Sequence, residues 1–272
     1  MSDASVEGAL VARLRAAGCV FAEDEAALLL AEPVSAHELE TMIRRRCAGE
    51  PLETVLGWAQ FAGLRVRVAR GVFVPRTRTE LLVELADELL ADRPTSAVVV
   101  DLCCGSGALG AAVARRHPSA VVHAADVDPD AVACARLNLP ADRVHAGDLF
   151  EALPAGLLGR VDVVVANAPY VPTPAIASMP PEAREHEARV ALDGGADGLT
   201  VQRRIAAGVR PWLARGGAVV IETSQEQAPR TARLLVDHGL SARVRRDEAR
   251  DGTAVVGRVD GGGIARDVHG RL

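Results

Sequence analysis

Between residues 97 and 258, short apolar segments alternate with segments of helical periodicity, and this alternation restricts the fold more than any other feature of the sequence. Strands separated by helices pair in parallel, because each helical crossover returns the chain to the same end of the sheet. The last two expected strands lie too close together for a crossover, so they should pair antiparallel at one edge. The sequence therefore predicts an α/β fold with a doubly wound sheet that ends in an antiparallel hairpin.

The expected elements follow from the apolar runs and from the hydrophobic spacing. Strands are expected near residues 97–101, 120–125, 143–146, 161–166, 217–222, 241–246 and 253–258. Helices are expected near residues 107–116, 129–138, 200–213 and 225–238.

Upstream of the sheet, the pattern is typical of short helices followed by a β connector. Ser35 and Glu38 form a capping-box pattern that predicts the start of a helix, and residues 77–80 repeat that pattern. Alternation of apolar and charged side chains over residues 64–68 predicts a short strand or hairpin. We expect three parts in the chain: a small helical domain with a β connector (1–74), the sheet domain (75–260) and a flexible tail (261–272).

Composition limits the classes of protein to which the chain can belong. Its 272 residues are 49% hydrophobic, which is sufficient for one full domain and a smaller one. No apolar run approaches the roughly 20 residues of a membrane span, and the N-terminus lacks the apolar region of a signal peptide. The net charge of −5 gives no general affinity for nucleic acid. We expect a cytoplasmic protein with no membrane contact and no direct nucleic-acid binding.

The five cysteines give no sign of a metal site or a disulfide framework. They form no CxxC pair, and no histidine accompanies them at zinc-ligand spacing. An odd number of cysteines without a secretory signal is typical of reduced thiols. We therefore expect free cysteines and no metal.

A glycine-rich loop, DLCCGSGALG over residues 101–110, connects the first expected strand of the sheet to its helix. Glycines at such a turn let a ligand approach the backbone, and ligands of open α/β sheets bind at this end of the strands. The loop also satisfies the GxGxxG fingerprint of dinucleotide sites, which is a weak signal by itself. Asp101 repels a phosphate but attracts a cationic group such as a sulfonium. The loop therefore favours S-adenosylmethionine over NAD.

Two further acidic residues follow the second and third expected strands of the sheet. Asp126 ends the second strand, where its carboxylate can accept hydrogen bonds from both ribose hydroxyls. Asp148 ends the third strand, where it can accept from an adenine amino group, and Leu149 or Phe150 can cover the base. A structural role in the turn is the alternative for Asp148. Together these residues predict a nucleoside ligand.

The fourth expected strand, VDVVVA over residues 161–166, ends on Asn167-Ala168-Pro169-Tyr170. A planar amide or amino nitrogen is a poor nucleophile, because its lone pair is delocalised. The Asn167 side-chain oxygen and the Ala168 carbonyl can each accept one N–H, which fixes the nitrogen and stabilises the charge that develops on it. Pro169 holds Ala168 in an extended conformation, and Tyr170 offers a face for stacking. The motif predicts methyl transfer to nitrogen; the alternative is a strand-end turn with a buried tyrosine.

In these motifs the chain resembles the protein glutamine-N5 methyltransferases, the family that modifies peptide-chain release factors. Asn-Ala-Pro-Tyr is similar to the family's Asn-Pro-Pro-Tyr motif, and DLCCGSGALG is similar to its cofactor loop. Residues 61–82 (FAGLRVRVARGVFVPRTRTELL) resemble its Pro-Arg-x-x-Thr-Glu segment, and residues 185–199 (EHEARVALDGGADGL) resemble the segment after its Asn-Pro-Pro-Tyr. The resemblance implies a class I methyltransferase domain and a helical N-terminal domain that recognises a protein substrate.

The resemblance also implies a reaction and a set of site residues. The methyl donor would be S-adenosylmethionine, and the acceptor a glutamine side-chain amide in the Gly-Gly-Gln loop of a release factor or in another protein. The catalytic residues would be Asn167 and Tyr170, with Ala168 and Pro169 completing the substrate-binding turn. The residues expected at the cofactor are Asp101, Cys103, Cys104, Gly105, Ser106, Gly107, Asp126, Asp148, Leu149 and Asn167.

The chain departs from the family pattern at several positions, and other functions compete with the one implied. Ala168 replaces a proline of the motif, Cys103 and Cys104 replace a Gly-Thr pair, and Arg78 replaces an acidic residue. These differences concern the choice of substrate more than the methyl transfer. The alternatives are an N6-adenine DNA or RNA methyltransferase, an NAD-dependent oxidoreductase in which residues 167–170 have no role, and a catalytically silent binding protein.

Overall fold

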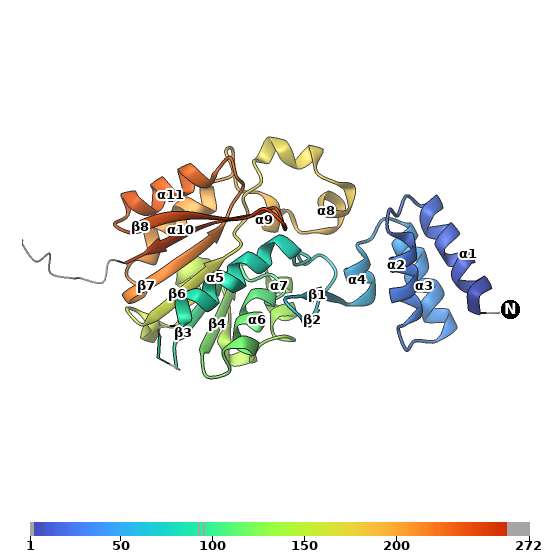
Figure 1. Cartoon of the computed structure of the whole chain (residues 1–272), viewed down its shortest axis with the longest axis horizontal. Coiled ribbons are helices and arrows are strands. Elements are labelled where there is room, and N and C mark those ends of the chain that lie inside the picture. Colours follow the sequence, from blue (N-terminus) through green and yellow to red (C-terminus); the bar gives the residue numbers. More distant parts are fainter. Residues whose placement is uncertain (1–2, 92, 95, 260–272) are drawn as a thin grey trace, which may run out of the picture.

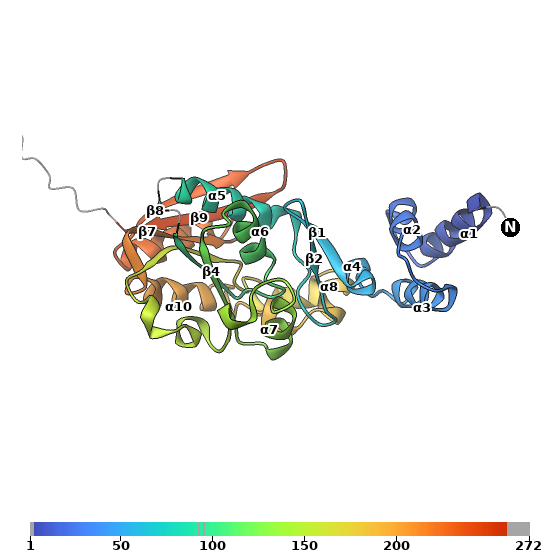
Figure 2. The ribbon, with the colours of Figure 1, turned by 90° about the horizontal axis from the view of Figure 1, so that it is seen from below.

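The computed structural model describes residues 3–91, 93–94 and 96–259. Three helices at the N-terminal end stand beside a larger α/β body, and a short hairpin lies between them (Figure 1, Figure 2). Within the described ranges, no helix is long and apolar enough to cross a membrane. The tail predicted over residues 261–272 lies outside the described residues.

The N-terminal helices are α1 (Asp3–Ala16), α2 (Ala22–Leu30) and α3 (Ala36–Cys47). They pack on an apolar cluster of their own, which includes the fully buried Leu14 and Leu29. The predicted capping box is confirmed: the Ser35 hydroxyl accepts from the Glu38 N–H, and the Glu38 carboxylate accepts from the Ser35 N–H at 2.9 Å. The separate core agrees with a helical domain, whose boundary at residue 74 stays a prediction.

A short connector leads from these helices to the α/β body. It consists of α4 (Leu52–Leu56), β1 (Trp58–Phe61) and β2 (Leu64–Arg67). Gly57 has a φ of 77° and ends α4, which turns the chain into β1. Because β1 and β2 pair antiparallel, the strand or hairpin predicted over residues 64–68 is a hairpin. The Trp58 indole donates to Glu32 at 2.8 Å, which joins the hairpin to the end of α2.

The body is built on a sheet that has seven strands in the described part of the chain, in the order β5-β4-β3-β6-β7-β9-β8. Neighbours from β5 to β7 pair in parallel, whereas β9 runs antiparallel to β7 and β8 antiparallel to β9. The strands are β3 (Val98–Leu102), β4 (Val121–Asp126), β5 (Val144–Ala146), β6 (Val161–Ala166), β7 (Leu213–Glu222), β8 (Ser241–Asp247) and β9 (Gly252–Arg258). The predicted doubly wound sheet with an antiparallel edge hairpin is confirmed.

One strand begins earlier than the sequence predicts. The apolar run indicated a strand over 217–222, but β7 starts at Leu213, which pairs with Val161. The register then shifts, and a Cβ on Gly217 would lie only 2.8 Å from the Val161 carbonyl oxygen. The early part of β7 was missed because Ala214, Arg215 and the glycines after them carry no strand pattern.

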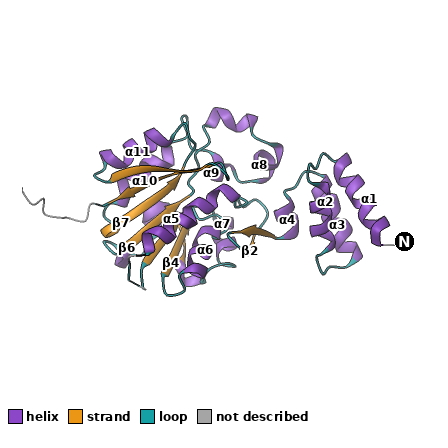
Figure 3. Cartoon of the chain, in the orientation of Figure 1, coloured by secondary structure: helices purple, strands orange, loops and turns teal. Residues whose placement is uncertain are grey.

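Helices cover both faces of the sheet (Figure 3). Val99 of β3 and Val163 of β6 belong to the apolar cluster that contains α5 (Glu80–Leu90), α6 (Ala108–Arg116) and α7 (Pro129–Ala135). Val100 and Val164 belong to the cluster that contains α10 (Thr200–Val209) and α11 (Ala228–Asp237). Adjacent side chains of a strand point to opposite faces, so a strand buried on both faces must be apolar throughout. This explains the unbroken valine runs.

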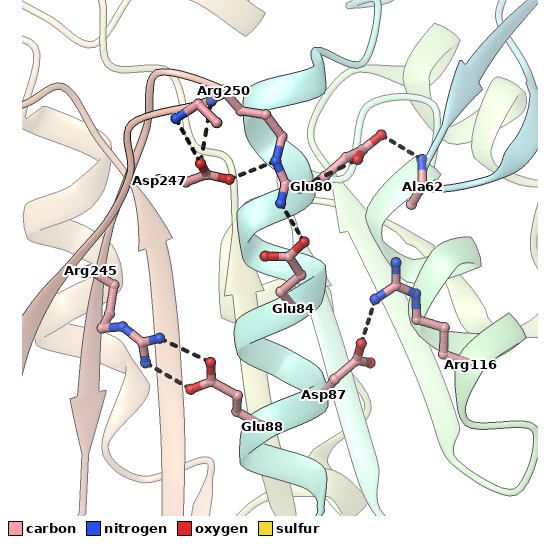
Figure 4. A network of polar contacts seen from close by, with 10 residues as sticks. Ala62, Glu80, Glu84, Asp87, Glu88, Arg116, Arg245, Asp247 and Arg250 are labelled. Carbon is pink, nitrogen blue, oxygen red and sulfur yellow. Dashed lines mark hydrogen bonds and ion pairs between the residues drawn. The ribbon is translucent and has the colours of Figure 1, made fainter.

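Acidic side chains of α5 hold the edge hairpin in place (Figure 4). Arg250, in the turn between β8 and β9, contacts Glu84 at 2.5 Å and Glu80 at 3.4 Å. Arg245 on β8 forms two contacts with Glu88, at 2.7 and 2.9 Å. Ion pairs this exposed contribute little free energy, but their geometry fixes the position of the hairpin relative to α5.

An insertion between β6 and α10 lies over the carboxyl end of the sheet. It contains the 3-10 helix η5 (Thr173–Ser178) and the short helices α8 (Pro181–His186) and α9 (Arg189–Leu192). The buried Glu187 carboxylate accepts from the Val74 N–H at 3.2 Å and from Arg76 at 2.5 Å, and the Ala188 N–H donates to the Gly71 carbonyl at 3.0 Å. The insertion is thereby attached to the segment that precedes α5.

Candidate active site

A cavity of about 730 Å³ lies at the carboxyl ends of β3, β4 and β6. The strand order reverses between β3 and β6, and open α/β sheets bind ligands at such a point. The walls come from the loops after these strands, from the 71–79 segment before α5 and from the insertion after β6. Of the predicted site residues, Asp101, Gly107, Ala168 and Tyr170 are not among the described residues that line the cavity, whereas the others line it.

The glycine loop after β3 has a backbone that only glycine adopts easily. Gly105 and Gly107 have φ values of 55° and 75°, and Cys103 also has a positive φ of 55°. A Cβ on Gly107 would lie 3.1 Å from the Cβ of Ala135 in α7, so the loop packs tightly behind the cavity. Gly105 lines the cavity itself, where the absence of a side chain lets a ligand reach the backbone.

Asp126, at the end of β4, fixes the glycine loop and faces the cavity. Its Oδ2 accepts from the Gly105 N–H and its Oδ1 from the Asp128 N–H, both at 2.9 Å. Burial raises the pKa of Asp126, and backbone hydrogen bonds from Asp128, Gly105 and Val127 partly offset that effect. Each carboxylate oxygen accepts one backbone N–H and retains a second lone pair for a ligand. The neighbouring Asp128 caps α7, because its side chain accepts from the Asp130 N–H.

Asp148 and Leu149 form the cavity wall that follows β5. Asp148 Oδ2 is bound by Arg204 of α10 at 2.7 Å, and both side chains are half-exposed. Leu149, with a φ of 47°, lines the cavity. Phe150 is buried instead against Trp212, with ring centroids 5.9 Å apart, so of the two side chains proposed to cover a base only Leu149 lies in place.

Asp101 lies behind the glycine loop and not in the cavity wall. It is fully buried, and its Oδ2 accepts from the Gly110 N–H in α6 at 2.9 Å. Its Oδ1 has no hydrogen-bond partner among the described residues. Burial raises the pKa of Asp101 to about 7. The contact with a cationic ligand that we predicted for Asp101 stays a prediction, and the contact that is present positions α6.

Replacing Asp101 by asparagine is expected to change how stability depends on pH. The folded pKa of about 7 lies above the ordinary value of 3.8, so the protonated carboxyl stabilises the fold fully below pH 4. That contribution is lost as the pH rises to about 7, because the unfolded chain ionises first. Between pH 5 and pH 8 the wild type should lose about 2 kcal/mol more than Asp101→Asn in urea unfolding. Equal losses would contradict the raised pKa.

The adjacent cysteines of the loop, Cys103 and Cys104, are unreactive neutral thiols. All five cysteines are free, and Cys103 lines the cavity beside the buried Cys104. Burial raises the pKa of both thiols, and the carboxylates of Asp101 and Asp126 add to the shift. The thiols are therefore neutral at physiological pH. In the described part of the chain, no group of three or more His, Cys, Asp or Glu side chains is arranged to hold a metal.

Asn167 brings a carboxamide to the cavity directly after β6. Its Nδ2 donates to the Thr79 hydroxyl at 3.3 Å, whereas its Oδ1 has no hydrogen-bond partner among the described residues. Pro169 also lines the cavity, and Ala168 between them is fully buried. With its nitrogen engaged by Thr79, the carboxamide is held so that its oxygen remains an acceptor.

The Tyr170 hydroxyl has a hydrogen-bond partner that the sequence did not indicate. It donates to Glu222 Oε1 at 3.2 Å, at the carboxyl end of β7, and Arg78 contacts the same oxygen at 3.3 Å. Burial raises the pKa of Tyr170 to about 12, so its hydroxyl is neutral. Stacking of this ring on a substrate stays a prediction, and its observed contacts are with Glu222 and Arg78.

Sequence reasoning missed the part of the site that comes from before α5. The sequence places Thr79 in a capping pattern over residues 77–80, but α5 has no side-chain cap. Instead Thr79 is buried and contacts Asn167, 88 positions further along the chain. Glu222 and Arg204 were likewise unassigned. One sequence feature does indicate Glu222 as a site residue: it is a polar residue at the end of β7, another parallel strand of the sheet.

The fold and the site together define a class I methyltransferase. Its features are a parallel sheet with an antiparallel edge hairpin, a glycine loop after β3, an acid after β4 and an Asn-Ala-Pro-Tyr turn after β6. The family model described as "Methyltransferase small domain" matches residues 64–204. Among solved structures, the fold is similar to a 16S rRNA N2 G1207 methyltransferase from T. thermophilus, with a TM-score of 0.51 and 21% identity over 74% of this chain and 49% of that chain.

Comparison with curated proteins identifies the family. The chain is 40% identical to a release factor glutamine methyltransferase of Streptomyces coelicolor over 189 residues, which are 68% of this chain and 67% of the relative. It is 33% identical to the same enzyme of Agrobacterium fabrum over 267 residues, which are 88% of this chain and 92% of the relative. The chain belongs to the release factor glutamine methyltransferase family, as the resemblance in its motifs predicted.

Proposed function

We propose that this enzyme transfers a methyl group from S-adenosylmethionine to the side-chain amide nitrogen of a glutamine in a peptide-chain release factor. The observation that carries the proposal is the state of Asn167 in the cavity wall. Its nitrogen is engaged by Thr79 and its oxygen has no partner among the described residues, so it presents an acceptor for an N–H of the substrate. The names of the curated relatives support the choice of a release factor.

The proposed chemistry requires the acceptor nitrogen to localise its lone pair. The Asn167 oxygen and the Ala168 carbonyl would each accept one N–H of the substrate amide, which would orient the nitrogen and stabilise the positive charge that develops as the new N–C bond forms and the bond between the methyl carbon and the donor sulfur breaks, with its electron pair left on sulfur. The methylated nitrogen is strongly acidic, so its proton leaves to water without a dedicated base. Pro169 restricts the backbone of Ala168 to extended conformations that aim its carbonyl.

The cavity suits S-adenosylmethionine, which supplies an electrophilic methyl group when it is bound. Asp126 retains lone pairs for the ribose hydroxyls, and Gly105 leaves the backbone of the loop accessible. Leu149 lines the wall where an adenine would lie, and Asp148 has its Oδ1 available because Arg204 binds only Oδ2. Membership of a methyltransferase family supports this cofactor independently.

A release factor substrate assigns a role to the N-terminal helices. We propose that α1 to α3, which have their own apolar core, recognise the body of the release factor while its glutamine enters the cavity. The buried Arg46 of α3 contacts Glu182 of α8 at 2.6 Å, and this contact joins the helices to the insertion that lines the cavity. A release factor substrate also agrees with the cytoplasmic location expected from the sequence.

Methyl transfer to a release factor of the same organism is the direct test. The enzyme is incubated with that protein and labelled S-adenosylmethionine, and peptide mass spectrometry locates the label. We expect one methyl group on the glutamine of the Gly-Gly-Gln loop and none when that glutamine is replaced by alanine. Label on nucleic acid, or on another protein only, would contradict the proposed substrate. Binding of NAD in preference to S-adenosylmethionine would contradict the cofactor.

A further inference from the structure

The turn over residues 167–170 is held at both ends by side chains outside it. At its start, Thr79 accepts from the Asn167 carboxamide. At its end, Gln227 donates to the backbone carbonyl of Tyr170 at 3.0 Å, and Glu222 accepts from the Tyr170 hydroxyl at 3.2 Å. The contact with Glu222 is the only one of these that orients the tyrosine ring, in the described part of the chain.

Glu222 is unusually placed for an acidic side chain. It is 1% exposed, and its strand neighbour Ile221 pairs with Ala166, so Glu222 lies level with the start of the turn. One carboxylate oxygen receives both Arg78 and Tyr170, and the other is buried without a hydrogen-bond partner among the described residues. A buried carboxylate costs free energy unless it is paired. Burial raises the pKa of Glu222, and the contacts with Arg78 and Tyr170 oppose that shift, so they favour the charged form that binds the tyrosine hydroxyl.

The middle of the turn depends on these outer contacts because Ala168 restricts the backbone little. A proline at position 168 would fix φ, whereas alanine lets φ vary within the extended region to which Pro169 restricts it. Pro169 disfavours the helical region for Ala168 but leaves φ free. The carbonyl of Ala168 is one of the two acceptors in the proposed reaction, so a change in its direction displaces the substrate amide.

We propose that Arg78 and Glu222 are positioning residues that hold Tyr170 by its hydroxyl and thereby fix the backbone that carries the Asn167 and Ala168 acceptors. Glu222 is the buried member of this charged pair and the Arg78 side chain is 41% exposed, and the function of the pair is to clamp the turn. They do not touch the substrate. The effect on catalysis rests on the proposed function, whereas the clamp itself is a property of the fold.

The clamp can be tested without any substrate, because Tyr170 is the one tyrosine of the sequence. Protein labelled with carbon-13 only at the Cζ atom of its tyrosine gives a single NMR signal that reports on the clamp. We expect Glu222→Gln and Arg78→Met to move or broaden that signal. Asp162→Asn is the matched control, since Asp162 is also buried and also contacts an arginine, Arg93, at 3.3 Å, but at the opposite end of β6. A signal unchanged by Glu222→Gln and Arg78→Met would overturn the clamp.

Kinetics then test whether the clamp positions the acceptors. Tyr170→Phe is the mildest variant, because it removes only the hydroxyl. As single variants, Tyr170→Phe and Glu222→Gln should each lower kcat about tenfold, the loss expected for one hydrogen bond to a charged group. The KM for the release factor and the Kd for S-adenosylmethionine should stay within about twofold of wild type, since neither residue lines the cavity and Tyr170→Phe keeps the ring that is predicted to stack on the substrate. Asp162→Asn should lower only the melting temperature.

A double variant separates positioning from general damage. If both residues act through one contact, Tyr170→Phe combined with Glu222→Gln should be no slower than the more damaging single variant. Additive losses in kcat, or losses confined to KM or to stability, would overturn the inference. If wild-type enzyme does not methylate the release factor, the proposed function is wrong. The NMR comparison still shows whether Arg78 and Glu222 hold Tyr170.

Discussion

Replacing Asn167 by alanine is expected to lower kcat for methyl transfer by about two to three orders of magnitude, the usual effect of removing one polar group that stabilises developing charge. The Asn167 oxygen has no partner among the described residues, so it can accept an N–H of the substrate amide. In the proposed reaction, that hydrogen bond becomes strongest when the substrate nitrogen localises its lone pair. A group used mainly in the transition state affects kcat far more than binding. The Kd of S-adenosylmethionine, measured by titration calorimetry, should rise only a few-fold.

Thr79→Val is a milder variant that tests the same role of Asn167. It keeps the Asn167 carboxamide but removes the hydroxyl that holds its nitrogen, so kcat should fall about tenfold, the loss typical of a single hydrogen bond. An Asn167→Ala variant that lost cofactor affinity as severely as kcat would show that Asn167 serves the cofactor and does not position the amide. Equal losses for the alanine and Thr79→Val variants would assign the effect to the shape of the turn.

The sheet could be predicted because burial on both faces requires apolar residues along the whole strand. Val163, Val164 and Val165 show this directly, since neighbouring residues enter different apolar clusters. The start of β7 could not be predicted in the same way. There the strand forms through backbone pairing around Gly216 and Gly217, and the backbone contribution leaves no pattern in the side chains.

The site was predictable where a residue acts at the end of its own strand. Asp126 and Asn167 line the cavity because strand ends converge at one edge of a parallel sheet. The predictions were weaker where the position of a side chain depends on contacts with residues far away in the sequence. Asp101 also ends a strand, but it lies below the glycine loop and accepts from Gly110. Tyr170 bonds to Glu222, 52 positions later, and no local pattern indicates such a contact.

Replacing Asp126 by alanine should raise the Kd of S-adenosylmethionine about a hundredfold, since hydrogen bonds from a ligand to a carboxylate are among the strong ones. The same carboxylate also holds Gly105 at 2.9 Å, so a loss of affinity alone does not separate a ribose contact from a loosened loop. Asp128→Ala is the matched control, because it removes a neighbouring acid that also lines the cavity but whose observed side-chain contact is a helix cap. It should reduce stability by about 1 kcal/mol and leave the affinity nearly unchanged.

The ribose contact is isolated by changing the ligand as well as the protein. S-adenosylhomocysteine and an analogue that lacks both ribose hydroxyls are titrated into wild type and Asp126→Ala. Wild type should prefer the hydroxylated ligand about a hundredfold, and the variant should bind the two ligands almost equally, because the partner of the hydroxyls is gone. If the variant kept the preference while losing affinity for both ligands, the carboxylate would act only through the glycine loop. Asp126 would then be a structural residue of that loop, and the ribose would be held by other groups.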